Sequence, residues 1–421
     1  MIKKILGTIK NHKIYADATV LFIATSLGNV FSLLFHLFMV RALTPEEYGV
    51  LNTLFACIMF FAMPTGNLQI TITRFVARYH GMGSKEAVYK LLKGMASRIL
   101  ILGCVIAVLI FFAAKPIAGF FRISNITPIY SMAGVVVISL LMPIPLAGLH
   151  GLQRFLSLGL AMISMNLIKL ILAVLLVWWG FGVSGALNSL TIASLLCVLI
   201  ALPILKYSMA KINFPEEHKV EVNFKEIYLY IFPVSLAILS FVLLTNLDII
   251  LVKHFFHPLD AGYYSIAQVN GKMVLFLPGA ICMVMFPKVA NSHAKKEGTI
   301  SYLKHSSLYI IALVAVGSLV VFMFPQTLLK IFTGKVYPEC YPLVRRFAIS
   351  MGFFAISFNF LLYYLSLNKI KFIMPFLILL LVEGVMIYFW HSSLVQILDI
   401  LIGISVSLFL INLIVVKKNF I

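Results

Sequence analysis

The stretch that decides the fold runs from residue 155 to residue 205 and reads FLSLGLAMISMNLIKLILAVLLVWWGFGVSGALNSLTIASLLCVLIALPIL. Its only charged side chain is Lys169, and Gly180 and Gly182 mark the place where it divides into two apolar runs. A helix needs about 20 apolar residues to cross the hydrocarbon core of a bilayer. The stretch therefore predicts two membrane-spanning helices, over residues 155–179 and 182–205.

The rest of the 421-residue chain has the same character. Hydrophobic residues make up 62% of it and charged residues 11%, with a mean hydropathy of +1.05. This is far more apolar surface than a soluble core could bury. Backbone polar groups cannot stay unpaired in lipid, so the spans must be helical. We expect an all-α polytopic membrane protein with twelve transmembrane helices, at 18–40, 49–72, 98–121, 127–149, 155–179, 182–205, 228–252, 261–286, 306–329, 344–367, 371–390 and 394–416.

The formal net charge of +19 would suit a nucleic-acid partner, but the Lys and Arg residues lie between the apolar runs. Most of them fall at the two ends of the chain and in the even-numbered loops, which predicts that both termini are cytoplasmic. Trp178, Trp179 and Trp390 all fall at helix ends that this topology places outside, where indole rings favour the interface. The five cysteines are scattered, so we expect neither a disulfide framework nor a metal site.

The chain contains an internal repeat. Sliding it on itself by 213 residues aligns Pro45 with Pro258 and Gly49 with Gly262, and the same shift aligns Glu47 with Asp260, Val76 with Val289, Ala77 with Ala290 and His80 with His293. Pro64 and Pro278, which interrupt helical backbone bonding, match after a slip of one residue. The repeat predicts two pseudo-symmetric six-helix lobes around a central cleft, at 1–205 and 228–421, joined by a cytoplasmic linker at 206–227. Chance similarity among biased residues is the alternative.

Polar side chains form stripes along four of the predicted spans. The spacing places Asn29, Ser32 and His36 with Thr25 on one face of the first span, and Ser265, Gln268 and Lys272 on one face of the eighth. Shorter stripes occur on the second and seventh spans, at Asn67, Thr71 and Arg74 and at Thr245 and Asp248. We interpret these four spans as the lining of a polar cleft. The alternative is that the polar groups only hydrogen-bond neighbouring helices.

Ionisable groups inside the spans are a second indication. Such groups are expensive at bilayer depth and usually face an interior or an aqueous cavity. Lys272 falls near the middle of its span, which favours contact with an anionic substrate over pairing with a buried carboxylate. Lys169 and Glu383 are also near mid-span, and either could belong to a structural ion pair. On its otherwise apolar helix, Glu383 is interpreted as a structural or lipid-facing protonated group.

Basic residues also repeat at the ends of the spans. Arg41 and Lys253 mark the predicted outer ends of the first and seventh spans, and Arg74 and Lys288 the inner ends of the second and eighth. A cationic ring of this kind attracts anionic head groups, including phosphate. Snorkelling anchors at the membrane surface are the alternative.

Two segments carry a family resemblance: RALTPEEYGVLNTLFA from Arg41, and TNLDIILVKHFFHPLDAGYYSIAQVNGKMVLFLPGAICMVMFPKVA from Thr245. They resemble the bacterial polysaccharide-transport family, the oligosaccharide flippases of the multidrug/oligosaccharidyl-lipid/polysaccharide superfamily. The resemblance implies a flippase in the bacterial cytoplasmic (inner) membrane that moves undecaprenyl-pyrophosphate-linked oligosaccharide to the outer leaflet for O-antigen, capsule or exopolysaccharide assembly. Membrane lipids, a polysaccharide polymerase and assembly proteins would be its partners. A cationic cavity for the lipid-linked sugar agrees with the role inferred for Lys272.

Two other functions stay open at this point. A drug/cation antiporter of the same superfamily would use Asp248 and Glu383 as ion-coupling groups for protons or sodium. A membrane polysaccharide polymerase or ligase would need acid/base residues on an extended outer loop, and the longest predicted one, at 330–343, offers only Glu339. We therefore expect a transporter and not an enzyme, with no catalytic residues and no cofactor.

Overall fold

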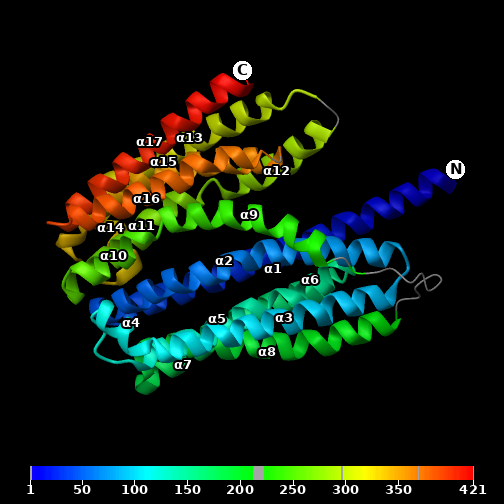
Figure 1. Cartoon of the computed structure of the whole chain (residues 1–421), viewed down its shortest axis with the longest axis horizontal. Coiled ribbons are helices and arrows are strands. Elements are labelled where there is room, and N and C mark those ends of the chain that lie inside the picture. The colour runs from blue at the N-terminus through cyan, green and yellow to red at the C-terminus, as the bar shows by residue number, and fades with distance from the viewer. Residues whose placement is uncertain (1, 212–221, 223, 295–296, 368, 421) are drawn as a thin grey trace. The chain divides into compact units, whose positions relative to one another are not determined.

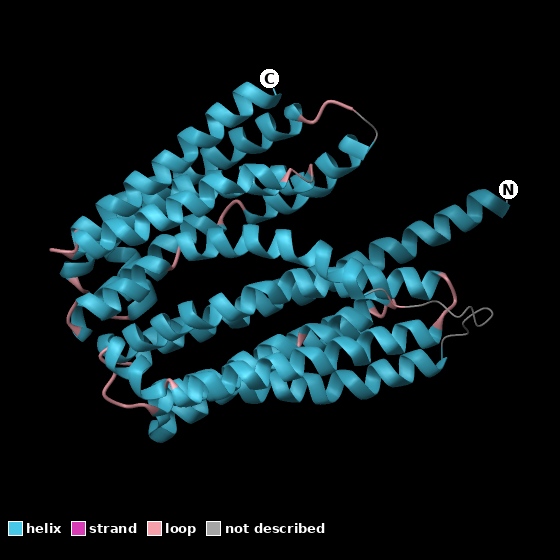
Figure 2. Cartoon of the chain, viewed as in Figure 1, coloured by secondary structure: helices cyan, strands magenta, loops and turns pink. Residues whose placement is uncertain are grey.

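The described part of the computed structural model covers the whole chain except residues 1, 212–221, 223, 295–296, 368 and 421. Within these residues every regular element is a helix (Figure 2). Helices are the form in which a single chain segment satisfies its own backbone hydrogen bonds in lipid. The chain is an all-α polytopic membrane protein, as its sequence predicts.

Figure 1 shows the helices in the order in which they follow along the chain. The first eight are α1 (Ile2–Ala42), α2 (Pro45–Gly81), α3 (Lys85–Phe112), α4 (Ala114–Phe120), α5 (Thr127–Leu141), α6 (Pro143–Gly151), α7 (Phe155–Leu176) and α8 (Gly182–Lys211). The remainder are α9 (Phe224–Leu244), α10 (Leu247–Phe255), α11 (Pro258–Phe276), α12 (Gly279–Ala294), α13 (Ile300–Met323), α14 (Pro325–Thr333), α15 (Tyr341–Ser366), α16 (Met374–Phe389) and α17 (Leu394–Phe420).

Each of the twelve predicted spans coincides with one of these helices or with a consecutive pair. Prolines mark three of the divisions: Pro143 begins α6, Pro278 lies between α11 and α12, and Pro325 begins α14. The pair α9 and α10 is bent by 43°. The interruption predicted at Pro278 is confirmed, whereas α2 continues through residue 64 as one helix. A long helix can accommodate the single backbone bond that a proline removes by curving.

Length and composition alone select seven helices among the described residues that could cross a membrane, or eight with the bent pair α9 and α10. One of the seven is a continuous run from Phe155 to Ala210, which is far too long for one crossing. Gly180, with φ of +87°, reverses the chain inside this run, and α7 then packs against α8. The run is therefore a hairpin of two spans, as the sequence predicts.

The described chain forms two compact units. Residues 1–42, 61–119 and 123–231 form the first, and residues 43–60, 120–122 and 232–421 form the second. In the first unit α7 packs against α1 and α8, and α5 packs against α3 and α8. Large apolar side chains such as Leu109 and Phe112 of α3 stay exposed. Such a surface is stable in lipid, where apolar exposure costs nothing. The predicted linker falls mainly on residues 212–221 and 223, outside the described part.

In the second unit α15 is central and packs against α11, α13 and α17. Residues 43–60, the first half of α2, belong to this unit and contact α11. There Gly49 faces Gly262: a Cβ atom on Gly49 would lie 3.0 Å from the Gly262 nitrogen. These are the same two glycines that the internal repeat aligns. The absence of side chains on these two glycines lets the two backbones approach closely.

We expect Gly262→Ala to destabilise the protein by about 1–3 kcal/mol, the usual cost of overpacking. The added Cβ would meet the backbone carbonyl of Pro45, which cannot move aside as a flexible side chain would. Gly403→Ala is the matched control, because Gly403 lies in α17 with open space around its Cα. Thermal unfolding in detergent should show a lower midpoint for Gly262→Ala only. Equal midpoints for the two variants would contradict the close crossing.

Candidate functional site

The second unit holds a buried polar cluster built on α10 and α11. Asp248 of α10 is fully buried. The Tyr264 hydroxyl donates to its Oδ2 at 2.9 Å, and the Gln268 amide donates to Oδ1 and Oδ2 at 3.1 and 3.2 Å. Tyr264 and Gln268 are four residues apart on α11, so both point to the same side of that helix. Both oxygens of the Asp248 carboxyl group therefore have donors within the unit.

Asn52 extends this cluster to α2. Its Nδ2 donates to Gln268 Oε1 at 2.9 Å, so the Gln268 side chain both accepts from Asn52 and donates to Asp248. The sequence stripes contain Gln268 and Asp248 but neither Asn52 nor Tyr264. Asn52 lies outside the stripe of its own span, and a tyrosine at helical spacing is usually a core residue. Asn52 lies three residues after Gly49, one of the glycines that the repeat aligns, and this position in the sequence could have pointed to it.

Lys272, one turn beyond Gln268 on α11, has a neutral partner. Its Nζ donates to Asn246 Oδ1 at 2.7 Å. Asn246 lies at the bend between α9 and α10, where its Nδ2 donates to Val242 O at 2.8 Å and to Thr245 Oγ1 at 3.2 Å. The side chain of Lys272 is partly buried. It interacts electrostatically with Asp248, but among the described residues no carboxylate oxygen lies within 4.0 Å of its nitrogen.

Glu383 of α16 is fully buried beside the same cluster. Neither of its carboxyl oxygens has a hydrogen-bond partner among the described residues. It lies close enough to Asp248 and Tyr264 to interact with both electrostatically, and α16 packs against α10. The lipid-facing interpretation of Glu383 is wrong, because the side chain points into the unit and not toward the membrane. A charged carboxylate without donors would be very costly here.

The first unit contains a smaller cluster around Lys169 of α7. Lys169 Nζ donates to Asn166 Oδ1 at 3.1 Å and to Ser32 Oγ of α1 at 3.4 Å. The ammonium group also lies 5.1 Å from the centre of the Phe35 ring. As with Lys272, no carboxylate forms an ion pair with Lys169 among the described residues. Each unit therefore holds one lysine within its spans through a neutral asparagine oxygen.

Lys169 and Glu383 occupy corresponding places in the repeat. They are 214 residues apart, the same separation as Pro64 and Pro278. In the predicted repeat, allowing the same slip of one residue, a lysine of the first unit thus corresponds to an acid of the second.

The other predicted site residues differ in their burial and in their partners. Ser265 is buried and donates to the Ala261 carbonyl of its own helix at 2.8 Å. Lys253 is also buried, its Nζ has no hydrogen-bond partner among the described residues, and it interacts electrostatically with Glu46. Three basic residues have exposed side chains, Arg41, Arg74 and Lys288; Asn29 is exposed and His36 half-buried. The side chain of Asn67 lies outside the described residues.

Comparisons with known proteins place the chain in context. An inward-facing multidrug resistance transporter of the MATE family in the MOP superfamily has a TM-score of 0.77 and 12% identity, covering 93% of this chain and 95% of that one. The lipid II flippase MurJ in an inward closed conformation has a TM-score of 0.74 and 12% identity, covering 95% and 87%. A MOP superfamily transporter from Pyrococcus furiosus has a TM-score of 0.63 and 14% identity, covering 95% and 94%.

At such low identity these structures establish a shared fold, that of transporters and flippases. No curated protein sequence matches the chain. The family described as polysaccharide biosynthesis protein matches residues 14–293, about two thirds of the sequence. The chain therefore belongs to the polysaccharide biosynthesis protein family.

Proposed function

We propose that the protein is a flippase that moves undecaprenyl-pyrophosphate-linked oligosaccharide from the cytoplasmic to the outer leaflet by alternating access. The family is one of polysaccharide biosynthesis, and the fold is shared with a lipid II flippase. A polyprenyl diphosphate sugar combines an apolar tail with a strongly anionic group, and the anionic group is the part that must cross the hydrocarbon core. A protein that carries it needs positive charge at membrane depth.

The observation that carries this proposal is the way the two lysines are held. Lys272 and Lys169 are both fixed by asparagine oxygens, at 2.7 and 3.1 Å, and neither is neutralised by an ion pair among the described residues. A lysine within a span costs about 2.5–3.5 kcal/mol on insertion scales. An asparagine dipole orients the ammonium group but leaves its net charge in place. Both groups are therefore prepared for an anionic ligand.

The antiporter alternative is less well supported. It requires acidic groups that a cationic drug can reach, and Asp248 and Glu383 are both fully buried. The Asp248 oxygens already accept hydrogen bonds from Tyr264 and Gln268. A cationic drug would have to displace these donors.

Asp248 and Glu383 are better suited to ion coupling than to binding a cationic drug. We propose that Glu383 binds and releases the coupling proton, with Asp248 as its electrostatic neighbour. Within the described part of the chain Glu383 has no donor to stabilise a carboxylate, so ionisation needs a rearrangement of α10, α11 or α16 around it. A group whose charge state depends on its surroundings in this way can link proton movement to the conformational cycle. Protons moving inward would then drive the sugar lipid outward.

The function can be tested with purified protein in sealed vesicles. A lipid diphosphate oligosaccharide is placed in the inner leaflet, and the rate at which its sugar becomes accessible to an external, membrane-impermeant glycosidase is measured. We expect protein-dependent exposure of the diphosphate substrate and little of a neutral glycolipid with the same sugar. Transport of a cationic dye without any exposure of the lipid diphosphate would refute the proposal and favour the antiporter.

We expect Lys169→Gln to raise the half-saturating substrate concentration in this assay by about 10- to 100-fold, since a hydrogen bond to a charged group contributes about 1.5–3 kcal/mol. Glutamine can keep a hydrogen bond to Ser32 but not the charge. Lys169→Arg should recover most of the loss. Lys115→Gln, an exposed lysine on α4, is the matched control. An unchanged half-saturating concentration in Lys169→Gln would exclude Lys169 from substrate binding.

A further inference from the structure

A surface cavity in the second unit has a lining that shares no residue with the clusters of α10 and α11. It has a volume of about 430 Å³, within the range of about 300–1,000 Å³ that small-molecule sites occupy. It is found where α13 ends and where α15 and α17 begin. Its lining is both charged and apolar, with Arg345, Arg346 and Asp399 beside Phe322, Ile349 and Ile402.

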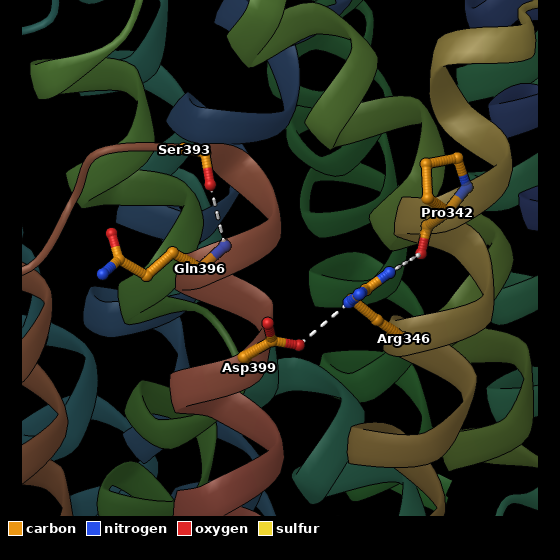
Figure 3. Close-up of polar contacts among 5 residues, drawn as sticks. All are labelled: Pro342, Arg346, Ser393, Gln396 and Asp399. Carbon is orange, nitrogen blue, oxygen red and sulfur yellow. Dashed lines mark hydrogen bonds and ion pairs between the residues drawn. The ribbon is translucent and has the colours of Figure 1, made fainter.

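The charged part of the cavity is formed by two consecutive arginines of α15. Arg346 Nε donates to Asp399 Oδ1 of α17 at 2.9 Å, and its Nη1 donates to the Pro342 carbonyl at 3.5 Å (Figure 3). Arg345 Nε donates to the Phe322 carbonyl at 3.2 Å, and its guanidinium group lies 4.9 Å from the centre of the Phe322 ring. An arginine has five N–H donors, so these contacts leave several for a ligand.

The charges in the cavity do not cancel. Asp399 pairs with Arg346, and among the described residues no acidic side chain pairs with Arg345. Two guanidinium groups and one carboxylate leave a formal charge of +1. The cavity therefore matches a ligand group with a single negative charge.

The position along the helices fits the level of lipid head groups. Arg346 lies five residues after the start of α15, and Asp399 five residues after the start of α17. At a rise of about 1.5 Å per residue, both are roughly one and a half turns inside the helix ends. Phe322 and Ile349 expose about half and over a third of their surface. Apolar groups beside a cationic group are what a lipid with an anionic head and a hydrocarbon chain would contact.

We propose that this cavity binds the phosphate head group of an anionic membrane phospholipid, with the guanidinium groups of Arg345 and Arg346 on the phosphate and the lipid chain along Phe322 and Ile349. Arginine presents a fork of donors that matches phosphate oxygens. A phosphodiester carries one negative charge and so complements the net charge of the cavity, whereas a diphosphate carries more.

A purely structural role for these residues explains fewer of these observations. Arg346 and Asp399 are partly exposed, 34% and 57% at their side chains. An exposed ion pair contributes little to stability, about 0–1 kcal/mol. Such a pair leaves both the cavity and the unneutralised Arg345 unexplained. A phospholipid bound across α13, α15 and α17 would join three helices at once.

The full-length protein in detergent is titrated with phosphatidylglycerol, and binding is followed by native mass spectrometry and by the rise in thermal unfolding temperature. Phosphatidylcholine, which has no net charge, is the lipid control, and Lys330→Gln, an exposed lysine on neighbouring α14, is the protein control. We expect preferential binding of phosphatidylglycerol, weakened severalfold in Arg345→Gln and in Arg346→Gln and unchanged in Lys330→Gln.

The Asp399→Asn variant distinguishes phosphate binding from a purely structural ion pair. If the cavity binds phosphate, removing the competing carboxylate frees Arg346 and should tighten phosphatidylglycerol binding severalfold. If the residues form only a structural ion pair, Asp399→Asn should lower lipid binding and unfolding temperature as much as Arg346→Gln does. That result, or equal binding of the two phospholipids by the unaltered protein, would overturn the proposal. Binding of undecaprenyl phosphate without binding of phosphatidylglycerol would overturn the assignment to a phospholipid.

Discussion

Replacing Lys272 with alanine is expected to reduce translocation of the lipid-linked oligosaccharide by about 10- to 100-fold. This range corresponds to the loss of one hydrogen bond to a charged group, about 1.5–3 kcal/mol. The variant should fold, because Lys272 holds no carboxylate in an ion pair among the described residues and Asp248 keeps its donors Tyr264 and Gln268. The rate of glycosidase exposure in sealed vesicles measures the effect, with the amount of inserted protein determined in parallel.

Two further substitutions separate charge from structure at this position. Lys272→Arg keeps the charge and should retain much of the activity. Asn246→Asp places a carboxylate where the amide oxygen now lies, 2.7 Å from the ammonium group. It should neutralise Lys272 and abolish translocation, although the shape of the side chain is unchanged. A structural role for Lys272 predicts the opposite, a folded and active Asn246→Asp protein with a stronger contact.

Lys417→Ala, an exposed lysine in the last turn of α17, controls for the loss of a positive charge as such. It should translocate at the rate of the unaltered protein. Full activity of a well-expressed Lys272→Ala protein, or of Asn246→Asp, would remove Lys272 from the mechanism.

The arrangement of spans could be predicted from the sequence because one physical requirement controls it. Every crossing needs a long apolar helix, so apolar runs and their polar breaks give the twelve segments directly. The continuity of α2 through residue 64 could not be predicted, since a proline can bend or break a helix according to what packs around it. The repeat in the sequence aligns Gly49 with Gly262. Their contact in space could not be predicted from that alignment, because it depends on how the helices pack.

The site was predictable only in part, and the reason is chemical. Ionisable residues within spans are rare and expensive, so Lys169, Lys272 and Asp248 stand out in a sequence. Asn246, Asn166 and Asn52 decide what these groups can do, yet each is one polar residue among many that could bond to their own helix. The direction in which Glu383 points depends on how α16 packs against α10. A helix that is apolar all round carries no periodicity from which that direction could be read.

Replacing Glu383 with glutamine is expected to abolish the response of transport to a proton gradient. Each unit of pH difference across the membrane supplies about 1.4 kcal/mol per proton, enough for roughly a tenfold accumulation of substrate in the outer leaflet. Glutamine has nearly the same shape as protonated glutamate but cannot release a proton. We therefore expect Glu383→Gln to equilibrate the substrate between the leaflets without accumulating it, while the unaltered protein accumulates it when the outside is acidic.

The same vesicles, prepared with a proton gradient, with a sodium gradient or with neither, provide the measurement. Glu339→Gln, an exposed acid near the start of α15, should accumulate substrate like the unaltered protein and is the matched control. Accumulation by Glu383→Gln under a proton gradient would show that the proton binds elsewhere. Accumulation by the unaltered protein under a sodium gradient alone would assign the coupling to sodium. Because Lys272 is intact in Glu383→Gln, equilibration between leaflets should persist, which separates failure of coupling from failure of substrate binding.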